Sequence, residues 1–206
     1  MWITPEDIPE LRNRAVNSNT VWVAFQSAVD QAVTTYDTLF FPSGSPAVPF
    51  PDSGHPNIVG DPVEAYAEIF AFASLVHPNA ALRADYAQRS RRLLMYAIDI
   101  AKLGVLPISQ NPVGFRDAQF STYNRANSWG EAWGLTVDWL QASNTLTAAD
   151  LADIRKVFMD WANIQLTAYN HPVPVGAVND PQLLSNPANL RAALNNYYTG
   201  HMRQLT

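Results

Sequence analysis

The sequence contains no cysteine in its 206 residues, so disulfide bonds and thiol chemistry are excluded. Cytosolic and exported proteins can both lack cysteine, and the compartment is therefore left open. No apolar run approaches the roughly 20 residues that a membrane-spanning helix needs. The amino-terminal segment has no basic stretch followed by an apolar one, so no signal peptide is visible and no membrane span is expected.

Positive charge is also scarce. The chain has 13 lysines and arginines against 18 acidic residues, which gives a net charge of −5 with histidine neutral. Nucleic-acid binding depends on a basic surface that displaces counterions from phosphates, so nucleic acid is disfavoured as the main ligand. Hydrophobic residues make up 48% of the chain and charged residues 15%. This composition is typical of a globular protein with a large apolar core, and it argues against disorder.

Several catalytic and ligand-binding motifs are absent as well. The sequence has no HExxH zinc motif, no GxSxG nucleophile motif and no glycine-rich phosphate loop. The histidines lie on separate segments without a second ligand at a metal-binding spacing, and they are His55, His77, His171 and His201. The first three each precede a proline, which predicts turn or loop positions. We therefore predict no metal site and no cofactor.

Helical periodicity dominates what is present. Apolar residues recur at three- and four-residue intervals, and no stretch of strict alternation predicts a strand. Thr4 and Pro5 predict the start of a helix, while Asn79 and Gly104 predict the N-cap and the end of another. The expected helices cover about residues 4–16, 21–40, 61–76, 79–104, 124–143, 147–169 and 186–206. In the segment 147–169, the residues expected to face the core are Leu151, Ile154, Phe158 and Trp161.

The order of these elements predicts an all-α fold. A short turn at His77 and Pro78 predicts an antiparallel helical hairpin, and proline-rich loops separate other helices. This alternation favours an array of helical hairpins over a closed four-helix bundle. We expect one helical domain over residues 1–206. Because the last expected helix reaches Thr206 without a glycine, asparagine or proline stop signal, we expect this domain to be a truncated part of a larger one.

An aromatic and basic cluster lies in the segment 124–143. Arg125, Trp129 and Trp133 follow one another at four-residue intervals, which places them on one helix face. In one interpretation the tryptophans pack in the core, helped by the close helix contact that Gly130 and Gly134 allow. In the other, the face is a platform on which a sugar ring stacks beside an arginine that binds its acidic group.

A polar cluster lies in the last expected helix. Tyr197 and His201 share one face of that helix, Asn196 lies on the neighbouring face, and Asn195 and Tyr198 flank them. Adjacent asparagines are poor helix formers, so another interaction must offset their cost. The cluster is either a buried hydrogen-bond network or a site. In a site, an amide would donate to a substrate carboxylate while tyrosine or histidine transfers a proton.

Parts of the chain resemble the N-terminal toroidal region of polysaccharide lyases of the alginate-lyase and heparinase II/III-like kind. The resemblance is carried by GDPVEAYAEIFAFASLVHPNAALRADYAQRSRRLLMYAID, by NRANSWGEAWGLTVDWL with LTAADLADIRKVFMDWA, and by ALNNYYTGH. It implies helical hairpins that form part of an incomplete (α/α) toroid, with a substrate cleft across one end. It also implies a periplasmic or secreted location.

The resemblance further implies β-elimination on a uronate-containing acidic polysaccharide. Asn196, or Asn195 if the register shifts by one residue, would neutralise the uronate carboxylate. Such lyases often read Asn-Asn-His where this chain reads Asn-Asn-Tyr, so the base is either Tyr197 or His201. The residues expected to bind substrate are Arg125, Trp129, Trp133 and Tyr198.

Two other functions compete with this one. A glycoside hydrolase on a similar toroid would need two carboxylates that face one cleft, chosen from Glu131, Asp138 and Asp117. A non-catalytic carbohydrate-binding or scaffold domain would instead bury the polar cluster with its hydrogen bonds satisfied.

Overall fold

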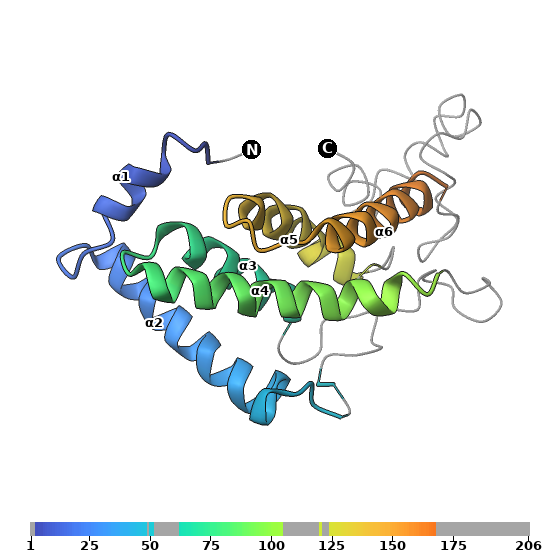
Figure 1. Ribbon diagram of the computed structural model, residues 1–206, viewed down its shortest axis with the longest axis horizontal. Coiled ribbons are helices and arrows are strands. Elements are labelled where there is room, and N and C mark those ends of the chain that lie inside the picture. The colour runs from blue at the N-terminus through green and yellow to red at the C-terminus, as the bar shows by residue number, and fades with distance from the viewer. Residues whose placement is uncertain (1–2, 49, 52–61, 105–119, 121–123, 168–206) are drawn as a thin grey trace, which may run out of the picture. The chain divides into compact units, whose positions relative to one another are not determined.

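The computed structural model describes residues 3–48, 50–51, 62–104, 120 and 124–167 (Figure 1). Helices account for 76% of these residues, and no strand occurs among them. The α-helices are α1 (Ile8–Asn13), α2 (Thr20–Thr35), α3 (Val63–Val76), α4 (Ala80–Ala101), α5 (Asn124–Gln141) and α6 (Ala148–Thr167). The predicted all-α class is therefore confirmed for the described part of the chain. The helix expected over 186–206 lies outside it.

Contacts within the chain define two compact units. The first consists of Met1–Asp52, Gly60–Met95 and Ala132–Ala148, and the second of Ser53–Val59, Tyr96–Glu131 and Ala149–Thr206. Each unit is built from segments that lie far apart in the sequence. A single domain over the whole chain, and its arrangement as a toroid, stay predictions.

The first helix begins at Ile8, and the predicted start at Thr4 is wrong. Thr4 instead closes a turn, in which its backbone N–H and its hydroxyl donate to Asp7 Oδ2 at 2.8 and 3.0 Å. Pro9 explains the later start, because it has no N–H to donate to the carbonyl of Pro5. In the observed helix Pro9 occupies one of the first two positions, where no such donor is required.

The second helix has a strong N-cap that the sequence prediction did not identify. Asn19 Oδ1 accepts hydrogen bonds from the N–H groups of Val21 and Trp22 at 3.1 and 3.5 Å. The helix then continues as a short π-helix, η1 (Tyr36–Phe40), where the Phe41 N–H donates to the Tyr36 carbonyl at 2.8 Å. The π-helical turn is wider than an α-helical one, and the side chains of Tyr36 and Phe40 within it are both buried in the aromatic core.

The third and fourth helices begin and end close to the predicted residues. Asn79 is confirmed as the N-cap of α4, since its Oδ1 accepts from the N–H groups of Ala81 and Leu82 at 2.8 and 3.3 Å. Gly104 is confirmed as the residue at which the chain leaves this helix. Its φ of +103° lies in a region that favours glycine, and its N–H donates to the Ala101 carbonyl at 3.0 Å.

In the first unit, α3 is the central helix. Nine of its 14 residues are buried, including the polar Glu64 and Ser74, as is typical of a helix covered on all sides. Helix α3 lies beside α4 (Figure 1), and Ser90 Oγ of α4 donates to the Ala67 carbonyl of α3 at 2.7 Å. Helix α1 contributes Arg12, whose Nε donates to the Leu75 carbonyl at 2.7 Å. These bonds satisfy carbonyl groups of α3 while its apolar side chains fill the core.

Aromatic rings make up much of this core. Phe25 of α2 and Trp139 of α5 both contact Phe72 of α3, with ring centroids 5.1 and 5.3 Å away. Phe40 contacts Tyr66 in an edge-on arrangement at 5.3 Å. Edge-on and tilted pairs of this kind add about 0.5–1.5 kcal/mol each beyond the area that they bury.

The second unit has its own aromatic core. Trp161 of α6 packs edge-on against Phe120 at 5.3 Å. The prediction that Leu151 faces this core is wrong, because its side chain is 41% exposed. The buried stripe of α6 instead follows a four-three-four spacing that starts one residue earlier, through Asp150, Ile154, Val157 and Trp161.

Ion pairs on the surface of the second unit join α4 to α6. Lys102 Nζ lies 2.7 Å from Asp99 Oδ1 and 2.8 Å from Asp153 Oδ2.

Within the described part of the chain, no helix combines the length and the apolar composition that crossing a membrane requires.

Candidate functional site

The predicted catalytic residues fall outside the described part of the chain. These are Asn195, Asn196, Tyr197 and His201, together with the predicted substrate-binding residue Tyr198. Their proposed roles therefore stay predictions that rest on the sequence.

The predicted sugar-binding residues lie on α5 and are mostly buried. Arg125 is 1% exposed and Trp133 is fully buried, while Trp129 is half-buried. A sugar ring stacks on an aromatic ring only where that ring has exposed surface. The burial of Arg125 and Trp133 therefore fits the packing interpretation. Of the three side chains, only Trp129 has appreciable solvent-exposed surface. Among the residues that the structure describes, the buried Nε1 of Trp129 has no hydrogen-bond partner.

The carboxylates considered for a hydrolase are not brought together in the described residues. Glu131 is exposed and Asp138 is half-buried on the same helix, α5, and Asp117 lies outside the description. Seven residues of helix correspond to a rise of about 10.5 Å. Glycosidase carboxyl pairs lie roughly 5–9.5 Å apart and face each other across the substrate.

His77 is a buried turn residue, as its position before a proline predicted. Its Nδ1 accepts a hydrogen bond from the Asn79 N–H at 3.0 Å, so the neutral ring carries its proton on Nε2. The ring lies between Trp22 and Tyr86, with centroids 5.6 Å from each. Burial lowers the pKa of His77 below its ordinary value, and the nearby Arg83 lowers it further. Across the described residues, no group of three or more histidines and acids has a metal-binding arrangement.

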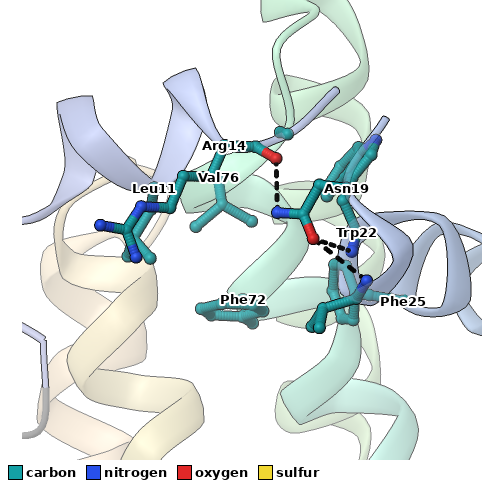
Figure 2. Close-up of a pocket in the computed structure, with 9 residues that line it drawn as sticks. Leu11, Arg14, Asn19, Trp22, Phe25, Phe72 and Val76 are labelled. Atoms are coloured by element: carbon teal, nitrogen blue, oxygen red, sulfur yellow. Dashed lines mark hydrogen bonds between the residues drawn. The ribbon is translucent and has the colours of Figure 1, made fainter. Parts of the chain in front are cut away.

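The first unit contains a groove that the sequence did not reveal. It has a volume of about 390 Å³ and lies among α1, α2 and α3 (Figure 2). We call it the α1–α3 groove, and it is lined by Leu11, Arg14, Ala15, Asn19, Val21, Trp22, Phe25, Phe72 and Val76.

Asn19 holds the turn at one end of the α1–α3 groove. Besides capping α2, its Nδ2 donates to the Arg14 carbonyl at 2.9 Å, as Figure 2 shows. One side chain therefore fixes both the end of α1 and the start of α2. The position of Asn19 before a helix is a local signal that could have predicted the cap, but not the groove beside it.

The surroundings of this groove are rich in arginine. Arg14 lines it, and the guanidinium of Arg12 donates to a carbonyl in the last turn of α3. Arg83 Nη1 donates to the carbonyls of His77 and Pro78 at 2.7 and 3.0 Å. Burial lowers the pKa of Arg12, and the positive charge of Arg83 acts in the same direction. Cations near the carboxyl end of a helix interact favourably with its dipole, which accounts for part of this clustering.

Comparisons of the chain with protein-family models, with curated proteins and with solved structures find no significant match.

Proposed function

We propose that the chain is a polysaccharide lyase-like domain that acts on uronate-containing acidic polysaccharide by β-elimination. Two features together support this proposal. One is the all-helical character of the described residues, including the packed pair α3 and α4 in a segment that resembles these lyases. The other is the Asn-Asn-Tyr sequence at 195–197, where such lyases place a carboxylate-binding asparagine. In this proposal α3 and α4 form one hairpin of an incomplete toroid.

The proposed reaction needs a group that stabilises negative charge. Removal of the C5 proton places charge on the uronate carboxylate, and hydrogen bonds from the Asn196 or Asn195 amide would stabilise it. Tyr197 or His201 would take the proton. The electron pair of the C5–H bond then forms the C4–C5 double bond as the bond from C4 to the leaving oxygen breaks, and that oxygen receives a proton. No water is consumed, and the product carries an unsaturated uronate.

Variants of the motif test the assignment of these roles. Asn196→Ala and Asn195→Ala separate the two possible registers, since only the residue at the carboxylate is expected to affect the rate strongly. Tyr197→Phe and His201→Gln each remove a proton-transfer group while keeping most of the side-chain volume. A loss of about a hundredfold or more in one of the two would identify the base. Unchanged rates in all four variants would contradict the proposed site.

A non-catalytic role is the second candidate, and the burial of Arg125 and Trp133 favours it. In this case the domain binds carbohydrate or acts as a scaffold, and α5 contributes to packing. Measurable binding to an acidic polysaccharide with no unsaturated product would support this role over the lyase.

A further inference from the structure

The proposed lyase activity assigns no role to the α1–α3 groove. Its apolar walls are largely aromatic, since the Trp22 and Phe25 centroids lie 5.9 Å apart and those of Phe25 and Phe72 lie 5.1 Å apart. In Figure 2, the Phe72 ring lies next to that of Phe25, and Val76 lies above Phe72 in the view. Edges and faces of aromatic rings are the surfaces against which a further ring packs well.

One cation lines the groove. Arg14 pairs with Glu10 through Nε at 2.9 Å, and its side chain is 66% exposed. Within the described part of the chain, its terminal nitrogens make no hydrogen bond. Both nitrogens therefore remain available to an acceptor. A guanidinium presents its donors in a planar fork that matches a carboxylate or a sulfonate.

Two further arginines lie near the end of α3 that borders the groove. Arg12 and Arg83 add positive charge near the end of α3, and neither has a carboxylate within ion-pair distance among the described residues. Glu10 pairs with Arg14 through Nε alone, so the two terminal nitrogens of Arg14 keep their donors for a second acceptor. An anionic group could accept hydrogen bonds from the free Arg14 nitrogens, which a cationic group could not.

We propose that the α1–α3 groove binds a small aromatic anion, with its ring between Trp22 and Phe72 and its carboxylate or sulfonate at Arg14. The volume of about 390 Å³ lies in the range of roughly 300–1,000 Å³ that small-molecule sites occupy. A protein partner would need an interface of about 800 Å² on each side, for which a groove of this size supplies only a part. The proposal is independent of the lyase function.

Naphthoate is a suitable probe, with naphthalenemethanol as its neutral counterpart and octanoate as its non-aromatic one. Binding is followed in the intact chain through the indole N–H NMR signal of Trp22, assigned as the signal that Trp22→Phe removes. We expect naphthoate to shift this signal in a saturable way and to bind more tightly than both counterparts. Equal binding of naphthalenemethanol would overturn the role of the charge, and equal binding of octanoate would overturn the role of the ring.

Two exposed positions supply variants that leave the core intact. Arg14→Met keeps an unbranched side chain but removes the charge, and we expect it to weaken naphthoate binding by about two- to fivefold, as for an exposed ion pair. Val21 lines the groove and is 75% exposed, so Val21→Lys and Val21→Glu form a matched pair. Lysine should strengthen naphthoate binding and glutamate should weaken it, with naphthalenemethanol unaffected by either. If Trp22 does not respond to naphthoate, or if the three variants bind it equally, the proposal is wrong.

Discussion

Arg89 Nη1 lies 2.6 Å from Asp37 Oδ1, which joins the middle of α4 to the π-helix that ends α2. The same guanidinium uses Nε to bind Asp85 Oδ2 at 2.7 Å, and its Cζ lies 4.7 Å from the centre of the Tyr36 ring. Arg89 therefore combines two ion pairs with a cation–π contact. Its side chain is only 18% exposed, so these contacts are screened by solvent less than those of a surface arginine.

Arg89→Met should destabilise the fold, because it removes both ion pairs and leaves Asp37 and Asp85 without their shared cation. We expect the free energy of unfolding to fall by about 1–2 kcal/mol, measured by chemical denaturation. Among the described residues, Lys156 pairs only with Asp160 of its own helix, and it is 54% exposed, so Lys156→Met is the control. Its expected effect is below about 0.5 kcal/mol. Equal effects of the two variants would contradict the role given to Arg89.

Stability should depend on pH through His77. Burial depresses its pKa in the folded protein below 6.5, so the unfolded chain binds the proton more tightly. The stability that the neutral His77 ring allows is fully present above pH 6.5. It is lost as the pH falls from 6.5 through the pKa that His77 has in the folded protein. Arg83 disfavours the protonated ring and Asp30 of α2 favours it, but burial is the largest effect.

The measurement is the free energy of unfolding on either side of pH 6.5, compared between the native chain and His77→Phe. Phenylalanine keeps a ring against Trp22 and Tyr86 but cannot be protonated. The variant should therefore lose less stability than the native chain as the pH falls through this window. If both chains lose the same amount, His77 does not control the dependence.

Asn19→Ala should loosen the junction between α1 and α2. It removes the cap of α2 and the bond to the Arg14 carbonyl, and we expect a loss of about 1 kcal/mol in the free energy of unfolding. Asn19→Asp keeps the capping oxygen and loses only the donor. Its stability should lie between those of the native chain and Asn19→Ala, and an aspartate variant as unstable as the alanine variant would argue against capping.

Truncation of two leucines tests the description of the core. Leu93 of α4 is fully buried, whereas Leu151 of α6 is 41% exposed. Leu93→Ala should cost about 2–5 kcal/mol because it leaves a cavity, and Leu151→Ala should cost far less. Similar losses at the two positions would support the original expectation that Leu151 faces the core.

Local signals explain which parts of the fold the sequence could predict. Asn79 and Gly104 act through bonds within a few residues of themselves, so their roles could be predicted from type and position. The predicted helix start at Thr4 was wrong although Thr4 is a typical N-cap residue. Thr4 forms a turn with Asp7 instead, and Pro9 lacks the N–H that a helix starting at Thr4 would need. In α6, periodicity correctly predicted the buried Ile154 and Trp161, but it assigned Leu151 to the core where Asp150 is buried instead.

The candidate sites depend on tertiary packing, which local patterns do not contain. The spacing of Arg125, Trp129 and Trp133 placed them on one helix face, but it could not distinguish a sugar platform from a packed core. The observed burial of Arg125 and Trp133 favours packing. The α1–α3 groove exists only because three helices meet around Phe72, so no single stretch of sequence indicated it.

The ultraviolet absorbance of unsaturated uronate tests the proposed β-elimination most directly. It is recorded while the chain is incubated separately with alginate, a heparin-type polysaccharide and a hyaluronan-type polysaccharide. We expect the absorbance to rise with at least one of them, and Asn196→Ala to slow that rise about a hundredfold by removing the donor to the carboxylate. Constant absorbance with all three polysaccharides would contradict the proposed function.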